Sequence, residues 1–140
     1  ENYYPTMEFE EICAMPIKDM AHTNAVLFMW TTSGFLEKSF EVVRSWGFEY
    51  KASFIWDKVL HNIGYYNSVR HEILLLCVKG TYPIQNVKLY DSVYTAERTE
   101  HSKKPDYFYD MIEDLYPNSK KIELFARNNR KGWTSFGNQT

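Results

Sequence analysis

The residues with the clearest chemical potential lie in the C-terminal third of the chain, where residues 101–105 read His-Ser-Lys-Lys-Pro and a helix is predicted to follow. The first turn of a helix carries backbone N–H groups without intrahelical partners and a partial positive charge, so it can bind an anion. Lys104 would add a full positive charge beside these groups. The alternative is a solvated helix entry capped by Ser102, and local physics alone favours that alternative.

A second group of candidates surrounds residues 57–70, which are predicted to form an exposed loop or hairpin. Tyr65 and Tyr66 could stack on the bases of a nucleic acid, although packing in the core or at its rim is the more common role of an aromatic residue. Arg70 and Arg98 could contact its phosphates. Either arginine could instead belong to a surface ion pair, and Glu72 is the candidate partner of Arg70.

The charge of the chain is uneven. Its 140 residues carry a formal net charge of −2, so the chain as a whole is not a strongly basic nucleic-acid binder. Residues 1–50 have a net charge of −5 and residues 51–140 a net charge of +3. A modest basic face on the later half is therefore plausible, although a small-molecule substrate would fit this balance about as well.

Cysteine usage and hydropathy give no sign of a disulfide-rich, zinc-binding or membrane-spanning protein. The two cysteines, Cys13 and Cys77, sit in apolar surroundings, and we interpret them as reduced core residues of an intracellular protein, cytoplasmic or associated with the nucleoid or nucleus. No spacing of cysteine and histidine suggests a zinc site, and we expect no metal. The longest apolar run, residues 73–78, is too short to span a bilayer, and no signal peptide is visible.

Strand-like and helix-like segments alternate along the chain, which predicts a single α/β domain over residues 1–140 with helices on both faces of a sheet. Residues 25–30 form a continuous apolar run that is typical of a buried parallel strand. Residues 52–56, 71–78 and 120–126 are predicted to form further strands. The stretch 80–100 is predicted to be irregular.

Two helices are predicted from apolar spacing and end signals. Ser33 can cap the first helix and Gly47 ends it. The second begins at Pro105, a favoured first helical residue, and stops at Pro117. Their predicted buried residues are Leu36, Phe40 and Val43 in the first helix and Phe108, Met111, Ile112 and Leu115 in the second.

Four motifs occur in a fixed order: Tyr-Tyr-Pro-Thr-Met at residues 3–7, the Lys-Pro pair before the second helix, Ile-Glu-Leu-Phe-Ala-Arg at 122–127, and Phe-Gly-Asn-Gln at 136–139. Together they resemble the MT-A family of adenine N6-methyltransferases over nearly the whole chain. The resemblance implies a Rossmann-like class I methyltransferase fold. It also implies a permuted order, in which the acceptor-side motifs precede the donor-side strand.

The resemblance assigns the methyl donor, S-adenosylmethionine, to the C-terminal motifs. It implies that Lys104 contacts the donor, that Arg127 lies near its ribose, and that Asn129 and Arg130 lie at its methionine end. Asn138 and Gln139 would bind the ribose hydroxyls, since an amide supplies both a hydrogen-bond donor and an acceptor. Glu123 could also reach a ribose hydroxyl, although a strand carboxylate that faces solvent is an equally good interpretation.

On the acceptor side, the resemblance implies that Tyr4 lines the adenine pocket, with a packing role as an even alternative. The family's catalytic Asp-Pro-Pro-Trp tetrapeptide does not occur in this sequence. We therefore expect an N-terminal segment to precede residue 1, and we expect residues 1–140 alone to be inactive.

The function implied is methylation of adenine N6 in nucleic acid, with DNA favoured over RNA because the chain has short loops and no added subdomain. Homo- or heterodimer assembly stays open, and no membrane partner is expected. The alternative is a non-catalytic subunit that binds nucleic acid or a partner.

Overall fold

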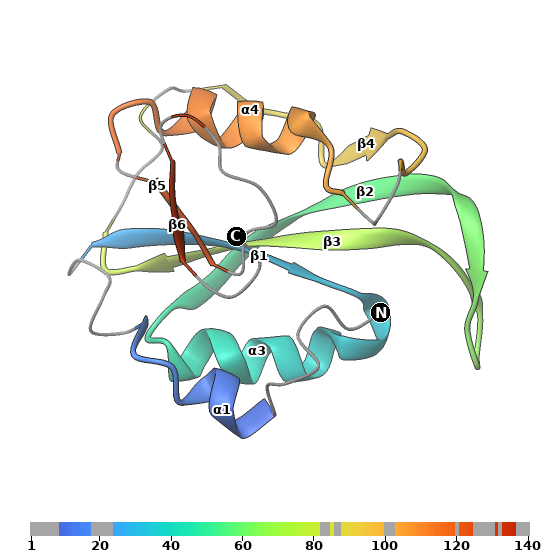
Figure 1. The fold of residues 1–140 in the computed structure, drawn as a ribbon, viewed down its shortest axis with the longest axis horizontal. Coiled ribbons are helices and arrows are strands. Elements are labelled where there is room, and N and C mark those ends of the chain that lie inside the picture. The colour runs from blue at the N-terminus through green and yellow to red at the C-terminus, as the bar shows by residue number, and fades with distance from the viewer. Residues whose placement is uncertain are drawn as a thin grey trace.

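A four-stranded sheet forms the centre of the protein (Figure 1). Its strand order is β1 (Ala25–Thr31), β3 (Ser68–Lys79), β2 (Glu49–Ile63) and β4 (Val93–Thr95). β3 pairs antiparallel with β1 and with β2, whereas β4 pairs parallel with β2. The computed structural model describes residues 9–17, 24–81, 85, 88–99, 103–119, 121–124, 131 and 133–136.

Helices cover both faces of this sheet, as the sequence predicts (Figure 1). One face carries α1 (Phe9–Cys13) and α3 (Leu36–Ser45), and the 3-10 turn η1 (Ser33–Phe35) leads into α3. The other face carries α4 (Asp106–Leu115). An apolar cluster fills the space on each side, so the domain has two layers of core with the sheet between them.

The apolar run at residues 25–30 forms β1, but its pairing is antiparallel, so the prediction of a parallel strand is wrong. Alternate residues of β1 pack into the two different clusters, Leu27 and Met29 toward α3, and Phe28 and Trp30 toward α4. A strand that is covered on both faces is apolar at every position, whatever the direction of its neighbour. The continuous apolar run correctly predicted that both faces of β1 are covered, but it contains no information about strand direction.

A long hairpin joins β2 to β3, which corrects the predicted strand boundaries. β2 continues through residues 57–63, and the turn is confined to the residues around Gly64, whose N–H donates to the carbonyl of Asn67 at 2.8 Å. So short a connection forces the two strands to be antiparallel. The stretch 80–100 is not wholly irregular either, because it contains β4 at the edge of the sheet.

The helix ends differ from the predictions by small shifts. Ser33 makes no capping hydrogen bond, and α3 begins only after η1. Gly47 ends α3 as predicted, with a φ of 86°. Pro105 is the residue before α4, with an extended ψ of 140°, so the helix begins one residue later than expected. Its buried residues are as predicted, with Phe108, Met111 and Leu115 buried and Ile112 half-buried.

A second, two-stranded parallel sheet consists of β5 (Lys121–Leu124) and β6 (Trp133–Phe136). β5 lies within the predicted strand 120–126, whereas β6 was not predicted. Trp133 fastens this sheet to α4, since its indole N–H donates to Glu113 at 2.7 Å and its ring meets that of Tyr109 edge to face.

Both cysteines are free, but only Cys77 is a buried core residue, whereas Cys13 is half-buried. Cys77 is completely buried, and burial raises the pKa of its thiol to about 12. None of the helices in the described part of the chain has the length and apolarity that a membrane span requires.

Candidate functional site

Lys104 lies two residues before α4, where its ammonium group is enclosed by a carboxylate and two indole rings. Its Nζ is 2.5 Å from Oε1 of Glu72. The same atom is 5.0 Å from the ring centroid of Trp30 and 5.9 Å from that of Trp56, and both rings attract a cation that lies over their faces. The side chain is 19% exposed. The protein therefore orients this cation without closing it off from solvent.

Glu72 brings two lysines together on β3. It lies directly opposite Trp56 in the pairing of β2 with β3, and its side of the strand is the one that faces α4. Only 10% of its side chain is exposed. One carboxylate oxygen binds Lys104, and the other accepts a hydrogen bond from Nζ of Lys58 at 3.1 Å. Each oxygen of a single buried carboxylate thus holds a different ammonium group.

A bulge in β2 accompanies the burial of Lys58. The pairing of β2 with β3 is irregular between Asp57 and Asn62, and Val59 within this stretch has a φ of 71°. The left-handed region is costly for a β-branched residue, so the backbone is strained here. Oδ1 of Asp57 accepts a hydrogen bond from the Val59 N–H at 3.0 Å, which supports the bulge. Lys58 lies at the start of this stretch, two residues after Trp56, so the alternation of the strand places both side chains on the same face, and 8% of the Lys58 side chain is exposed.

The electrostatics of this network favour an ionised Glu72. Burial by itself would raise the pKa of the Glu72 carboxyl, but the charges of Lys104 and Lys58 and their hydrogen bonds outweigh it and lower the pKa below its ordinary value. At neutral pH the three groups therefore carry one negative and two positive charges. The network as a whole is positive, beside an opening to solvent.

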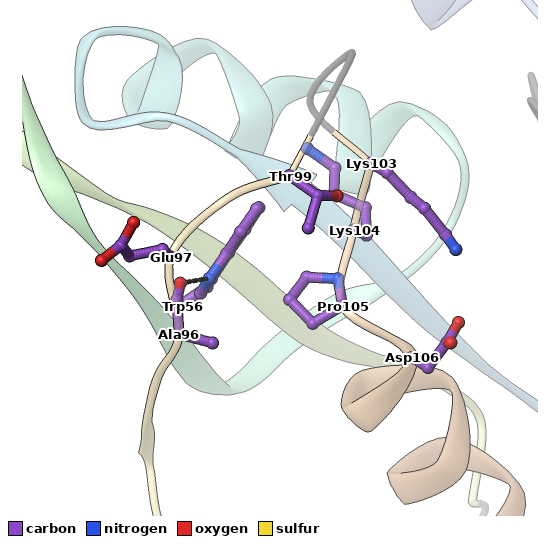
Figure 2. A pocket seen from close by; sticks show the side chains of 8 residues that line it. All are labelled: Trp56, Ala96, Glu97, Thr99, Lys103, Lys104, Pro105 and Asp106. Atoms are coloured by element: carbon purple, nitrogen blue, oxygen red, sulfur yellow. Dashed lines mark hydrogen bonds between the residues drawn. The ribbon is translucent and has the colours of Figure 1, made fainter.

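A pocket of about 200 Å³ borders Lys104 (Figure 2). Trp56 stands on one side, fixed by a hydrogen bond from its indole N–H to the Ala96 carbonyl at 2.8 Å. In Figure 2 the side chain of Lys103 extends away from the Trp56 ring. The complete lining is Trp56, Ala96, Glu97, Thr99, Lys103, Lys104, Pro105 and Asp106.

Asp106, the first residue of α4, and Pro105 before it line this pocket, so the structure brings together the two features that the sequence singled out, the helix end and Lys104. The arrangement suits a small anion, because a helix N-terminus and an ammonium group both attract negative charge. Asp106 and Glu97 add carboxylates to the same lining. These carboxylates would favour a ligand that also carries a positive group.

The turn of the β2–β3 hairpin presents apolar side chains to solvent. Tyr65 and Tyr66 are each 93% exposed, and Ile63 beside them is 96% exposed. The two tyrosine rings meet edge to face with their centroids 4.8 Å apart. Figure 1 shows this end of the hairpin projecting beyond the rest of the sheet, so the predicted exposure of residues 65 and 66 is confirmed.

Arg70 lies on β3 within this hairpin, and Arg98 contacts the hairpin from residues that follow β4. Arg70 pairs with Asp57, its Nε 3.2 Å from Oδ1, and the suggested pair with Glu72 is wrong. Glu72 is turned inward to its lysines and is not accessible from the surface. Arg98 donates to Oδ1 of Asn62 at 3.4 Å. Half of the Arg70 side chain is exposed, so it can still meet another anion.

Six of the sequence-derived site residues lie outside the described residues: Tyr4, Arg127, Asn129, Arg130, Asn138 and Gln139. Glu123 lies on β5 beside Ser135 of β6. The sequence analysis gave no role to Trp30, Trp56 or Lys58. One signal could have found this cluster: two charged residues, Lys58 and Glu72, stand at the edges of otherwise apolar strand segments. Within the described residues, no group of three histidine, cysteine or acidic side chains could hold a metal ion.

The chain matches one protein-family model and is similar to several known methyltransferases. A family model described as MT-A70 matches residues 1–139. The chain is 38% identical over 139 residues to the type II methyltransferase M.MunI of Mycoplasma sp., an alignment that covers 96% of this chain and 58% of that protein. It is 34% identical over 146 residues to a probable N(6)-adenosine-methyltransferase MT-A70-like protein of Oryza sativa subsp. japonica, covering 97% of this chain and 20% of that protein.

A human relative is similar to the same extent. The chain is 34% identical over 146 residues to the N(6)-adenosine-methyltransferase catalytic subunit METTL3 of Homo sapiens, covering 97% of this chain and 25% of that protein. The chain thus spans a little over half of the bacterial relative and a quarter or less of the plant and human relatives.

Proposed function

Because the chain belongs to the MT-A70 family, we propose that it transfers a methyl group from S-adenosylmethionine to N6 of adenine in nucleic acid. The single observation that carries this proposal is the oriented ammonium group of Lys104 at the N-terminal end of α4, beside a solvent-accessible pocket. Methyl transfer to a poor nucleophile depends mostly on positioning and on electrostatic stabilisation. An active site of this kind needs fixed charges, and the network of Lys104 supplies them.

The pocket beside Lys104 fits one end of S-adenosylmethionine, which supplies the methyl group. The carboxylate of its methionine end would lie against Lys104 and the first turn of α4. Its ammonium group would then be close to the carboxylates of Glu97 and Asp106. A volume of about 200 Å³ is below the roughly 300–1,000 Å³ of typical small-molecule sites. We therefore propose that the pocket takes only the amino-acid end of the donor.

We assign the rest of the donor to the C-terminal motifs. Asn138 and Gln139 would bind the ribose hydroxyls, with Arg127 beside the ribose and Asn129 and Arg130 near the methionine end. Glu123 on β5 is a further candidate for a ribose hydroxyl. The domain would then be a permuted class I methyltransferase, with the acceptor-side strands β1 to β4 before the donor-side strand β5 in the chain.

The acceptor is proposed to be an adenine that leaves its stack to enter a pocket beside Tyr4, since a paired adenine hides its amine. Tyr65 and Tyr66 would contact the flanking nucleotides and Arg98 a phosphate. Arg70 is a weaker candidate for a phosphate contact because Asp57 already holds it. DNA remains our favoured substrate because the described connections are short. A location inside the cell follows from this substrate.

Catalysis by residues 1–140 alone is not proposed. The family's Asp-Pro-Pro-Trp acceptor motif, which orients the amine, is absent from these residues. The absence of this motif is consistent with the alternative of a non-catalytic subunit, whereas a donor site at Lys104 weighs against it. Binding of S-adenosylmethionine therefore separates the two.

Calorimetric titration with S-adenosylmethionine tests the donor assignment. Lys104→Ala should weaken binding by about 1.5–3 kcal/mol, or about tenfold to 150-fold, the range for hydrogen bonds to charged groups. Lys51→Ala is the matched control, because Lys51 lies on β2 in an exposed pair with Glu49 and is not among the residues that line the pocket, so its loss should change affinity little. Unchanged affinity in both Lys104→Ala and Asn138→Ala would refute the assignment.

A further inference from the structure

Lys58 is a buried cation that does not reach the pocket. It is 6% exposed, and neither Lys58 nor Glu72 is among the residues that line the pocket. Its Nζ lies 3.1 Å from Oε2 of Glu72 and 5.8 Å from the ring centroid of Trp56. Burying an ammonium group is costly even when it is paired. The strained bulge at Val59 adds to this cost.

The net charge of Lys58, Glu72 and Lys104 indicates what Lys58 contributes. Glu72 carries one negative charge and contacts two ammonium groups through different oxygens. If Glu72 faced Lys104 alone, the pair would be neutral and would attract an anion only weakly. With Lys58 on the other oxygen, the three groups have a net charge of +1. Lys104 stays oriented by Glu72, and the positive potential beside the pocket is preserved.

We propose that Lys58 is a positioning residue that acts through Glu72, keeping this carboxylate from neutralising Lys104 and so maintaining an anion site at the pocket. The proposal rests on the proposed function in one respect, namely that the anion is the carboxylate of S-adenosylmethionine. Lys58 itself touches neither the donor nor the reacting atoms. The other charged groups in the lining, Glu97, Asp106 and Lys103, are the same in every variant below.

Two substitutions separate this role from a merely structural one. Lys58→Met removes the remote charge and leaves Glu72 paired with Lys104, so the network becomes neutral. The double variant Lys58→Met/Glu72→Gln removes the carboxylate as well, so the network returns to +1. If Lys58 only supported the fold, the double variant would bind the anion no better than the single variant. A lysine that balances charge makes the second substitution restore anion binding.

The experiment measures calorimetric affinity for two ligands, S-adenosylhomocysteine and 5′-methylthioadenosine, which share the nucleoside but differ in the amino-acid end. Lys58→Met should weaken the binding of S-adenosylhomocysteine by about threefold to tenfold, a Coulombic effect over roughly 10 Å. It should leave the affinity for 5′-methylthioadenosine unchanged. The double variant should recover most of the lost affinity. Lys51→Met is the matched control, because Lys51 is also on β2 but forms an exposed pair with Glu49 at 3.5 Å.

Three results would overturn the inference. These are an unchanged S-adenosylhomocysteine affinity in Lys58→Met, an equal loss for both ligands, and a double variant that binds no better than the single one. Near-ultraviolet circular dichroism establishes that each variant is folded. If Lys58→Met does not fold, Lys58→Gln replaces it, because glutamine is neutral and keeps a hydrogen-bond donor.

The same titrations separate this inference from the function on which it rests. One outcome is that Lys104→Ala weakens the binding of S-adenosylhomocysteine but not that of 5′-methylthioadenosine, while Lys58→Met weakens neither. In that case the donor site stands and the proposed role of Lys58 is wrong. If Lys104→Ala shows no selectivity, or if the wild type binds neither ligand, the donor site itself is wrong and the inference falls with it.

Discussion

Replacing Glu72 with glutamine should lower the free energy of unfolding by about 3–5 kcal/mol, the usual cost of leaving a buried charge without its partner. The structure explains why the upper part of this range applies. The carboxylate is 10% exposed and meets Lys58 at 3.1 Å, a separation at which the gross Coulomb attraction is about 5 kcal/mol in a medium of effective dielectric about 20. Its loss leaves two ammonium groups facing each other across a neutral amide.

Replacing Lys58 with methionine should cost much less, about 0–1.5 kcal/mol. Glu72 keeps Lys104 as its partner at 2.5 Å, so no charge is stranded. Methionine also fills much of the space of the lysine stem, and one buried charge no longer has to be desolvated. The two substitutions break the same contact, yet we expect their costs to differ by at least about 1.5 kcal/mol.

Urea denaturation at pH 7, followed by circular dichroism and tryptophan fluorescence, measures both costs. Glu49→Gln is the control, because it removes an exposed acid on β2, the strand of Lys58, and should cost less than about 1 kcal/mol. Equal costs for Lys58→Met and Glu72→Gln would refute the reasoning, as would a Glu72→Gln cost within the range of the control.

The stabilisation by Glu72 should also depend on pH in a defined direction. The folded protein lowers the pKa of this carboxyl below its ordinary value of 4.5, so the ionised form is favoured by folding. The stabilisation is therefore complete above the ordinary value and is lost as the pH falls through the lower, folded value. The difference between wild type and Glu72→Gln should be largest near neutral pH and should shrink below about pH 4.

Two further predictions concern the hairpin. Gly64→Ala should destabilise the protein in the same denaturation assay, since an added Cβ would lie 2.6 Å from the carbonyl oxygen of Asn67. Gly34→Ala is the control, because an added Cβ there has nothing within 4 Å, and it should be neutral or stabilise by up to about 1 kcal/mol. A larger loss of stability in Gly34→Ala than in Gly64→Ala would contradict the turn geometry. In salt titrations of binding to adenine-containing oligonucleotides, Arg98→Ala should flatten the salt slope by about one unit, and Arg70→Ala by less because Asp57 already neutralises it. Binding that ignores salt and both arginines would instead favour a nucleic-acid surface elsewhere.

Much of the fold could be predicted because its signals are local. The apolar spacing of α4, the end of α3 at Gly47 and the exposure of Tyr65 and Tyr66 each depend on a few neighbouring residues. The start of the helix beside Lys104 was likewise predictable, to within one residue at Pro105. The direction of β1 was not, because burial on both faces produces the same apolar run in parallel and antiparallel strands.

The sequence by itself determined the family, through four motifs in a fixed order, and with it the expectation that Lys104 faces a methyl donor. Only the tertiary structure decided what holds Lys104. Its partner Glu72 is 32 residues away on β3, and Lys58 reaches the same carboxylate from the irregular stretch of the neighbouring strand β2. Register and bulges arise when strands pair, and a side chain's partner across a sheet follows from them. No local pattern of residue types carries that information.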